Sequence, residues 1–238
     1  MTTQAGAPAP LPPQSSLEHL KKQAKQLLHA VRAGVGDALQ TIRRLHPKPD
    51  SFSGLRDAQL VIARQYGCRD WQQLVREVEL QKLRNATRAE QADQFVHLAC
   101  LRYNGDDRAW RYANANALLA EVPALADANL YCALAAGKLD AVREHLDAEP
   151  ALATQNGGPL NWPPLMYLTY SRVQSTQDEV LGIAQLLLER GADPDSHVMF
   201  DGLYRFSAMT GAMGEGERGP VDCPPHQFAD ALVDVLLD

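Results

Sequence analysis

Residues 186–195 read LLLERGADPD, and this stretch decides how the rest of the chain is interpreted. A run of leucines that leads into a charged pair is typical of the last turns of an amphipathic helix. Gly191 can end that helix, because glycine adopts positive φ at the position after the C-cap without strain. Pro194 presets a turn, and Asp193 and Asp195 can accept hydrogen bonds from turn amides. The stretch therefore predicts a helix that runs directly into a tight turn.

A repeated pattern lies upstream of this stretch. Residues 99–105 read ACLRYNG and residues 131–137 read YCALAAG, so that Cys100 and Cys132 occupy equivalent places 32 residues apart. Each segment is followed by a second helical pattern and then by the sequence PALA. A period close to 33 residues is typical of stacked two-helix units.

Two further units follow, and the last one is incomplete. They begin with the helical patterns at Pro164 and Ser207, and the second helix of the last unit, expected over 228–237, stops at the end of the sequence. An unfinished unit would leave apolar stacking surface uncovered, which favours a chain that naturally continues. Both units carry insertions between their helices, at 171–179 and 214–226, and such insertions often form binding loops.

These residues resemble the ankyrin-repeat family. Residues 135–142, AAGKLDAV, are similar to its helix–glycine turn–helix junction, and residues 186–195 are similar to its passage from the second helix into a finger loop. Pro163 and Tyr167 depart from the pattern, since the family commonly has Thr and His there. The resemblance implies an all-α solenoid of about four units over residues 91–238, the last one incomplete. It also implies binding of another protein by the concave face and finger loops.

A small helical module is expected before the repeats, over residues 15–84. Its apolar residues follow helical spacing, Ser15 and Glu18 form a candidate capping box, and Asp70 is a candidate N-cap. The expected core comprises Leu27, Leu60, Ile62, Tyr66 and Trp71. Residues 20–25, LKKQAK, and 57–67, DAQLVIARQYG, resemble a module that precedes ankyrin repeats in bacterial proteins. That resemblance implies no activity.

The first 14 residues are expected to form a disordered leader. They are rich in Ala and Pro and lack the charged and apolar regions of a signal peptide. No apolar run approaches the roughly 20 residues that span a bilayer. The four scattered cysteines form no C-x-x-C pair, which is typical of reduced thiols. Together these features predict a cytoplasmic protein without a membrane partner.

Charge is distributed unevenly along the chain. Residues 1–128 carry 17 Lys and Arg against 13 Asp and Glu, a net +4, whereas residues 129–238 carry 6 against 16, a net −10. An acidic surface repels nucleic-acid backbones, so nucleic acid is not the expected partner of the repeats. The alternative function is a nucleic-acid-associated regulator that uses the basic N-terminal helix. The basic side chains considered are Lys21, Lys22, Lys25, Arg32, Arg43, Arg44 and Lys48, with His19, His29 and His46.

No catalytic, cofactor or metal site is predicted. Cys223 and His226 lack a second Cys/His pair, and a tetrahedral zinc site needs four ligands. Turn and capping duties explain the acidic pairs Asp193/Asp195 and Asp178/Glu179, and Glu215/Glu217 lies in a glycine-rich loop. The glycine-rich residues 211–216 are not followed by the lysine of a phosphate-binding loop. A binding protein, and not an enzyme, is therefore expected; the competing hypothesis is a hydrolase or transferase with an irregular site among the insertions.

Aromatic residues of the last two units are the candidate partner-binding residues, because aromatic side chains dominate interface hot spots. They are Trp162, Tyr167, Tyr170, Phe200, Tyr204 and Phe206. The alternative is that some of them fill gaps in an irregular core. The predicted contact surface comprises the finger loops at 154–163 and 196–206 and the insertion at 214–226, with Trp162 and Tyr204 as the leading surface residues.

Overall fold

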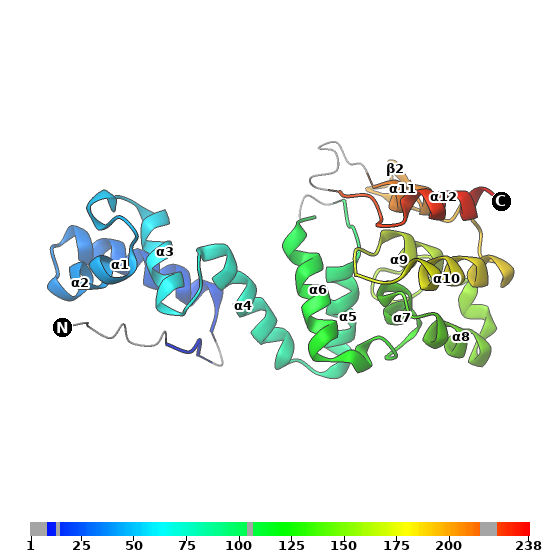
Figure 1. Ribbon diagram of the computed structural model, residues 1–238, viewed down its shortest axis with the longest axis horizontal. Coiled ribbons are helices and arrows are strands. Elements are labelled where there is room, and N and C mark those ends of the chain that lie inside the picture. The colour runs from blue at the N-terminus through cyan, green and yellow to red at the C-terminus, as the bar shows by residue number, and fades with distance from the viewer. Residues whose placement is uncertain (1–8, 13–14, 104–106, 215–222) are drawn as a thin grey trace. The chain divides into compact units, whose positions relative to one another are not determined.

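The computed structural model describes residues 9–12, 15–103, 107–214 and 223–238, and these residues are mostly helical. The chain divides into two compact units, Met1–Asn85 and Ala86–Asp238 (Figure 1). The predicted module ended at residue 84 and the predicted repeats began at 91. The first helix of the second unit begins earlier, at Arg88, because Thr87 and Glu90 form a capping box there.

The first unit consists of four α-helices and one turn of 3₁₀ helix among its described residues. They are α1 (Leu17–Arg32), α2 (Gly36–Leu45), η1 (Pro49–Ser51), α3 (Leu55–Gln65) and α4 (Trp71–Arg84). Ser16 caps α1 by accepting the amide N–H of His19, so the predicted cap at Ser15 is one residue too early. The predicted cap at Asp70 is confirmed by its 2.8 Å hydrogen bond from the Gln73 amide.

The core of the first unit lies between α1, α3 and α4. Its buried residues are Leu20, Ala24, Ala58, Ile62, Ala63, Cys68, Leu74 and Val78. Of the predicted core residues, Ile62 is buried, and Leu27, Tyr66 and Trp71 pack against this cluster while partly exposed. Leu60 is partly exposed and lies outside the cluster. On α3 its neighbours Ala58, Val61 and Ile62 occupy the buried face instead.

Part of the predicted leader is packed against the first unit. The Ala9 amide donates to the Gln65 carbonyl at 3.0 Å, and Leu11 packs on the core cluster. The expectation of disorder is therefore wrong for residues 9–12, because Leu11 buries apolar surface that the core leaves open. Residues 1–8 and 13–14 lie outside the described residues.

The second unit is built from helix pairs. They are α5 (Arg88–Ala99) with α6 (Ala109–Glu121), α7 (Leu130–Ala136) with α8 (Leu139–Ala148), α9 (Pro164–Tyr170) with α10 (Gln177–Glu189), and α11 (Ala208–Met213) with α12 (Ala229–Leu237). The two PALA sequences form the short 3₁₀ turns η2 (Pro123–Leu125) and η3 (Pro150–Ala153). The prolines suit these turns, because they occupy the first helical position, where no N–H is needed.

The helix pairs are stacked in chain order. The first helices contact one another in the sequence α5, α7, α9, α11, and α10 packs between α8 and α12 (Figure 1). Two of the first helices are almost wholly buried, since every residue of α9 and all but Tyr131 of α7 are buried. Gly137 and Gly191 have φ of 62° and 89°, which confirms the positive φ predicted for Gly191 and allows α7 to turn sharply into α8.

A β-hairpin follows the third pair, in the finger loop predicted at 196–206. Strands β1 (His197–Phe200) and β2 (Tyr204–Ser207) pair antiparallel, with Val198 opposite Phe206 and Phe200 opposite Tyr204. Asp201 and Gly202 have φ of 51° and 67°, the two positive values that a type I′ turn requires. None of the described helices combines the length and the apolarity that a bilayer crossing needs.

Candidate functional site

A groove of about 490 Å³ lies in the second unit, where three segments that are distant in sequence meet. Its size falls within the range of about 300–1,000 Å³ that ligand pockets occupy. The first segment consists of Arg102 and Tyr103, which follow α5. The second consists of residues just before α9 and one residue of α9, and the third is the hairpin. The lining residues are Arg102, Tyr103, Pro159, Leu160, Asn161, Trp162, Tyr170, Val198, Met199, Phe200 and Phe206.

Asp107 holds the first of these segments. Its carboxylate is 2% exposed and accepts the amide N–H of Arg102 at 3.0 Å and that of Tyr103 at 2.6 Å. These bonds fix Tyr103 at φ 53°, a left-handed conformation that is uncommon for a bulky residue. The Tyr103 ring is thereby placed 4.5 Å from the Phe206 ring, nearly parallel to it, and its hydroxyl donates to the carbonyls of Thr210 and Gly214.

Arg111 neutralises the buried Asp107 carboxylate. Its Nη1 lies 2.5 Å from Oδ1 of Asp107, and its Nη2 donates to the carbonyls of His97 and Cys100 at the end of α5. Arg111 is itself 6% exposed. A buried ion pair is favourable only when the remaining polar atoms are also bonded, as they are here. The pair therefore acts as a clamp that joins α6 to the end of α5 and to the groove.

Two tyrosines of the inner helices hold the second segment. The Tyr167 hydroxyl donates to the Gly157 carbonyl at 2.6 Å and accepts the Leu160 amide at 3.0 Å. Gly157 and Gly158 pack so closely on Tyr131 that an added Cβ would lie 1.9 Å and 2.5 Å from its atoms. Residues 157–162 therefore form a fixed turn, closed by a pair of backbone hydrogen bonds between Gly157 and Trp162.

Three residues of one hairpin face, together with Met199 of the other face, line the third side of the groove. Residues that lie opposite each other in an antiparallel pair share a face, and faces alternate along each strand. Val198, Phe200, Tyr204 and Phe206 therefore share one face, of which all but Tyr204 line the groove. Tyr204 is 57% exposed at the outer end of the same face.

The structure places the six predicted partner-binding residues in different environments. Trp162, Tyr170, Phe200 and Phe206 line the groove, and Tyr204 lies at the outer end of its hairpin face. The Trp162 ring is half-buried, with its centroid 5.1 Å from that of Tyr170. Tyr170 is 1% exposed, and its hydroxyl donates to the Ser207 carbonyl. Tyr167 is fully buried and outside the lining, so it offers no surface to a partner and instead holds the 157–162 turn.

Sequence reasoning missed Arg102 and Tyr103. Both lie in the repeated segment at 99–105, which was interpreted only as part of a repeat unit. The signal that could have found them is Asp107, because an Asp a few residues along a loop can accept hydrogen bonds from the loop amides that precede it, here those of Arg102 and Tyr103.

The predicted insertion at 214–226 folds inward at its described end. Cys223 and His226 are 6% and 4% exposed, so these two side chains offer no surface to a partner, whereas Pro225 between them is exposed. Arg172 holds it, donating from Nε to the Pro224 carbonyl at 2.7 Å and from Nη2 to the Gly211 carbonyl at 2.7 Å. Burial, with a smaller contribution from the Arg172 charge, lowers the pKa of His226 to about 3. Residues 215–222, which include Glu215 and Glu217, lie outside the described residues.

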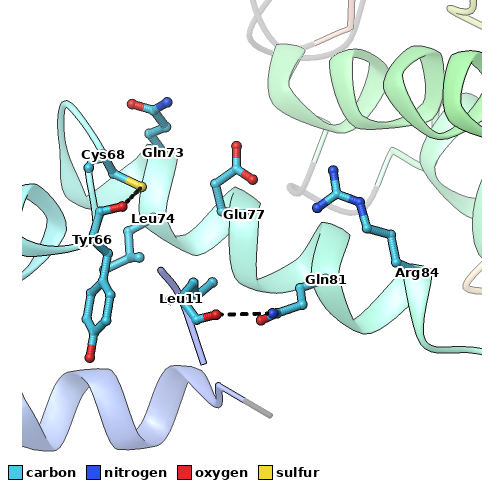
Figure 2. Close-up of a pocket in the computed structure, with 9 residues that line it drawn as sticks. Leu11, Tyr66, Cys68, Gln73, Leu74, Glu77, Gln81 and Arg84 are labelled. Carbon is cyan, nitrogen blue, oxygen red and sulfur yellow. Dashed lines mark hydrogen bonds between the residues drawn. The ribbon is translucent and has the colours of Figure 1, made fainter. Parts of the chain in front are cut away.

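A second cavity, of about 230 Å³, lies within the first unit (Figure 2). It is lined by the Tyr66–Cys68 loop, Leu11, and side chains of α4 that include Glu77 and Arg84. The Gln81 amide donates across it to the Leu11 carbonyl at 3.5 Å. Burial, aided by the Glu77 charge, raises the pKa of the Cys68 thiol, which disfavours the reactive thiolate. The geometry offers no activated group here.

The basic residues considered for nucleic-acid binding are solvent-exposed, with one exception. Lys21 pairs with Glu18 at 2.9 Å, whereas His46 is 8% exposed and bonds the Lys48 carbonyl and Asp57. His46 therefore has a structural role. The nucleic-acid alternative stays a prediction that rests on the other exposed cations.

The remaining candidate groups have structural roles in the described residues. Asp193 accepts the Asp195 amide at 2.9 Å, which confirms the predicted turn. All four cysteines are free and buried, and burial raises the pKa of Cys100 and of Cys132 to about 12. Among the described residues, no group of three or more His, Cys, Asp and Glu side chains is arranged to hold a metal ion.

Comparison of the chain with protein-family models, with curated proteins and with solved structures gives no match in any of the three. The family therefore remains a prediction from the sequence, and the function has to be argued from the groove.

Proposed function

We propose that the chain is an ankyrin-type repeat protein that binds another protein through the aromatic groove and carries out no catalysis itself. The repeat assignment is supported by the chain-order stack of helix pairs and by the hairpin that follows the third pair. The glycine-ended helices α7 and α10 support it as well. Stacked two-helix units with projecting fingers commonly use their concave side to bind proteins.

The convergence of aromatic side chains from three segments on one groove carries the binding proposal. Tyr103, Trp162, Tyr170, Phe200 and Phe206 all line it. The neighbouring hairpin leaves Met199 53%, Leu203 76% and Tyr204 57% exposed. Aromatic residues around a preformed pocket are what hot spots of protein interfaces contain. A partner that inserts an apolar side chain would remove this surface from water.

Affinity purification of the full chain from lysate of its source organism, followed by mass spectrometry, tests the proposal. The groove variant is Trp162→Ala with Tyr204→Ala. The control is Val35→Ala with Leu55→Ala, which removes two apolar residues of the first unit that are 48% and 38% exposed. We expect the groove variant to lose a partner that the control retains. Loss of about 2 kcal/mol at a hot spot corresponds to roughly a 30-fold weaker complex.

The contrary result is equally clear. If the groove variant has the thermal stability of the wild type and captures the same proteins in the same amounts, the groove is not the binding surface.

A further inference from the structure

The groove contains a positive charge that no acidic residue among its described lining residues balances. Among the described residues that line the groove, Arg102 is the only charged one, and none carries a carboxylate. Its Nη1 donates to Nδ1 of His97 at 2.6 Å, and His97 must be the acceptor because arginine has only donors. Among the described residues Arg102 forms no ion pair.

The Asp107 carboxylate, whose charge acts on Arg102, is already engaged. Both oxygens of Asp107 accept backbone amides, and Oδ1 also pairs with Arg111. Burial lowers the pKa of Arg102, and the Arg111 charge lowers it further. Both effects disfavour the protonated guanidinium. An anion bound next to it would favour the charged form and so offset them.

The charge also decides between two ligands that an aromatic groove could take. Aromatic faces attract cations such as methylated ammonium groups. A cation in this groove would meet the Arg102 guanidinium without a carboxylate to balance it, which is unfavourable in a partly buried site. A ligand that carries an anion next to an apolar group would match both the Arg102 charge and the aromatic lining of the groove. Arginine binds carboxylates well, because its planar fork can donate two parallel hydrogen bonds.

On the basis of the proposed function, we propose that the groove binds a partner-protein segment in which Asp or Glu lies next to a large apolar residue. The apolar side chain packs against the aromatic rings of the groove, which include those of Trp162 and Phe206, and the carboxylate pairs with Arg102. A peptide segment is favoured over a free small acid, because Leu203 and Tyr204, which are exposed and outside the lining, extend apolar surface beyond the groove.

Selection from a phage-displayed library of random dodecapeptides on the full-length protein tests this inference. We expect selected peptides to share an acidic residue adjacent to Phe, Trp, Leu or Met. One selected peptide and its Glu→Gln or Asp→Asn version are then titrated by calorimetry against wild type, Arg102→Gln and Arg102→Lys. The control is Arg143→Gln on α8, a helix that contributes nothing to the groove lining.

The expected results form a thermodynamic cycle. Arg102→Gln and the neutral peptide each weaken binding about tenfold or more, and the two changes together weaken it little further. Arg102→Lys retains part of the affinity, and Arg143→Gln retains all of it. If N-acetyltryptophan binds as tightly as the dodecapeptide, the segment assignment is overturned.

Two failures are distinguishable. Peptides that lose binding to Trp162→Ala with Tyr204→Ala, but carry no acid and ignore Arg102→Gln, overturn this inference and leave the proposed function standing. If no selected peptide depends on the groove residues for binding, both this inference and the proposed function are refuted.

Discussion

Replacement of Asp107 by Asn would test whether the Asp107–Arg111 clamp holds the groove together. The substitution keeps the shape of the side chain but removes the charge that neutralises Arg111, which is 6% exposed. It also replaces one carboxylate oxygen, which accepts hydrogen bonds, by an amide nitrogen, which donates them. The backbone amides of Arg102 and Tyr103 both donate to this carboxylate and need acceptors. Removing one partner of a buried ion pair costs about 3–5 kcal/mol, because the other charge is left uncompensated.

That free energy converts into a measurable shift. For a unit of this size, about 1 kcal/mol lowers the melting temperature by roughly 2–4 °C, so we expect a decrease of roughly 6–20 °C. In a Trp71→Phe background the remaining tryptophans, Trp110 and Trp162, belong to the second unit and report its unfolding alone. Thermal and urea unfolding followed by their fluorescence measures the change.

The matched control is Asp140→Asn, which removes the exposed 3.2 Å pair with Arg143. Exposed pairs contribute about 0–1 kcal/mol, so this variant should unfold close to wild type. A second check combines Asp107→Asn with Arg111→Gln, which should destabilise less than the sum of the single changes. If Asp107→Asn unfolds within about 1 kcal/mol of wild type, the clamp does not hold this loop and the reasoning is refuted.

Three further predictions concern other parts of the second unit. Gly211→Ala should destabilise it by about 1–3 kcal/mol in urea unfolding, because the new Cβ would lie 2.1 Å from the Tyr170 ring. The control lies in the first unit: Gly36→Ala, whose Cβ meets nothing within 4 Å, should not lower the stability of that unit. Tyr167→Phe should cost about 1–2 kcal/mol, because the Leu160 amide and Gly157 carbonyl lose their shared hydroxyl. An unchanged urea midpoint would mean that this hydroxyl is dispensable. His226 is buried and neutral, and its pKa is about 3 in the folded state, below the unfolded value of about 6.5. Its contribution to folding stability is therefore complete above pH 6.5. As pH falls toward 3 the unfolded state binds the proton first, and stability should decrease by up to about 1.4 kcal/mol per unit. His226→Gln should reduce this slope of stability against pH between pH 6.5 and 4.5. The carboxylates with lowered pKa values still stay ionised in that range. An unchanged slope would assign the pH dependence to other groups.

The parts of the fold that follow from local rules were predictable from the sequence. Gly191 ends its helix with positive φ, Asp193 bonds the turn that follows, and Asp70 caps its helix, as their residue types predict. Each depends on neighbours within a few residues. The hairpin at 197–207 was also accessible, because the pair Asp201–Gly202 between apolar residues is a strong signal for a type I′ turn, yet the stretch was predicted only as a loop.

The groove itself could be predicted only in part. Aromatic composition pointed to Trp162, Phe200 and Phe206, but composition alone does not separate a residue that lines a groove from one that supports it. Tyr167 shows the difference, because its ring is buried and only its hydroxyl bonds residues of the turn beside the groove. The role of Arg102 depends on which residues surround it in space, and those come from segments about 60 and 100 residues away.

Three tyrosines fix the walls of the groove through their hydroxyl groups. Tyr167 bonds the Gly157 carbonyl, Tyr170 bonds the Ser207 carbonyl, and Tyr103 bonds the carbonyls of Thr210 and Gly214. Burial raises the pKa values of Tyr167 and Tyr170, so both keep the proton that they donate. Each bond ties an aromatic ring to the backbone of a different segment, so the walls are ordered before any ligand arrives. A preorganised site loses little conformational entropy on binding. The choice of ligand then falls to the groups that are not engaged in holding the walls, which are the exposed hairpin residues and the Arg102 guanidinium.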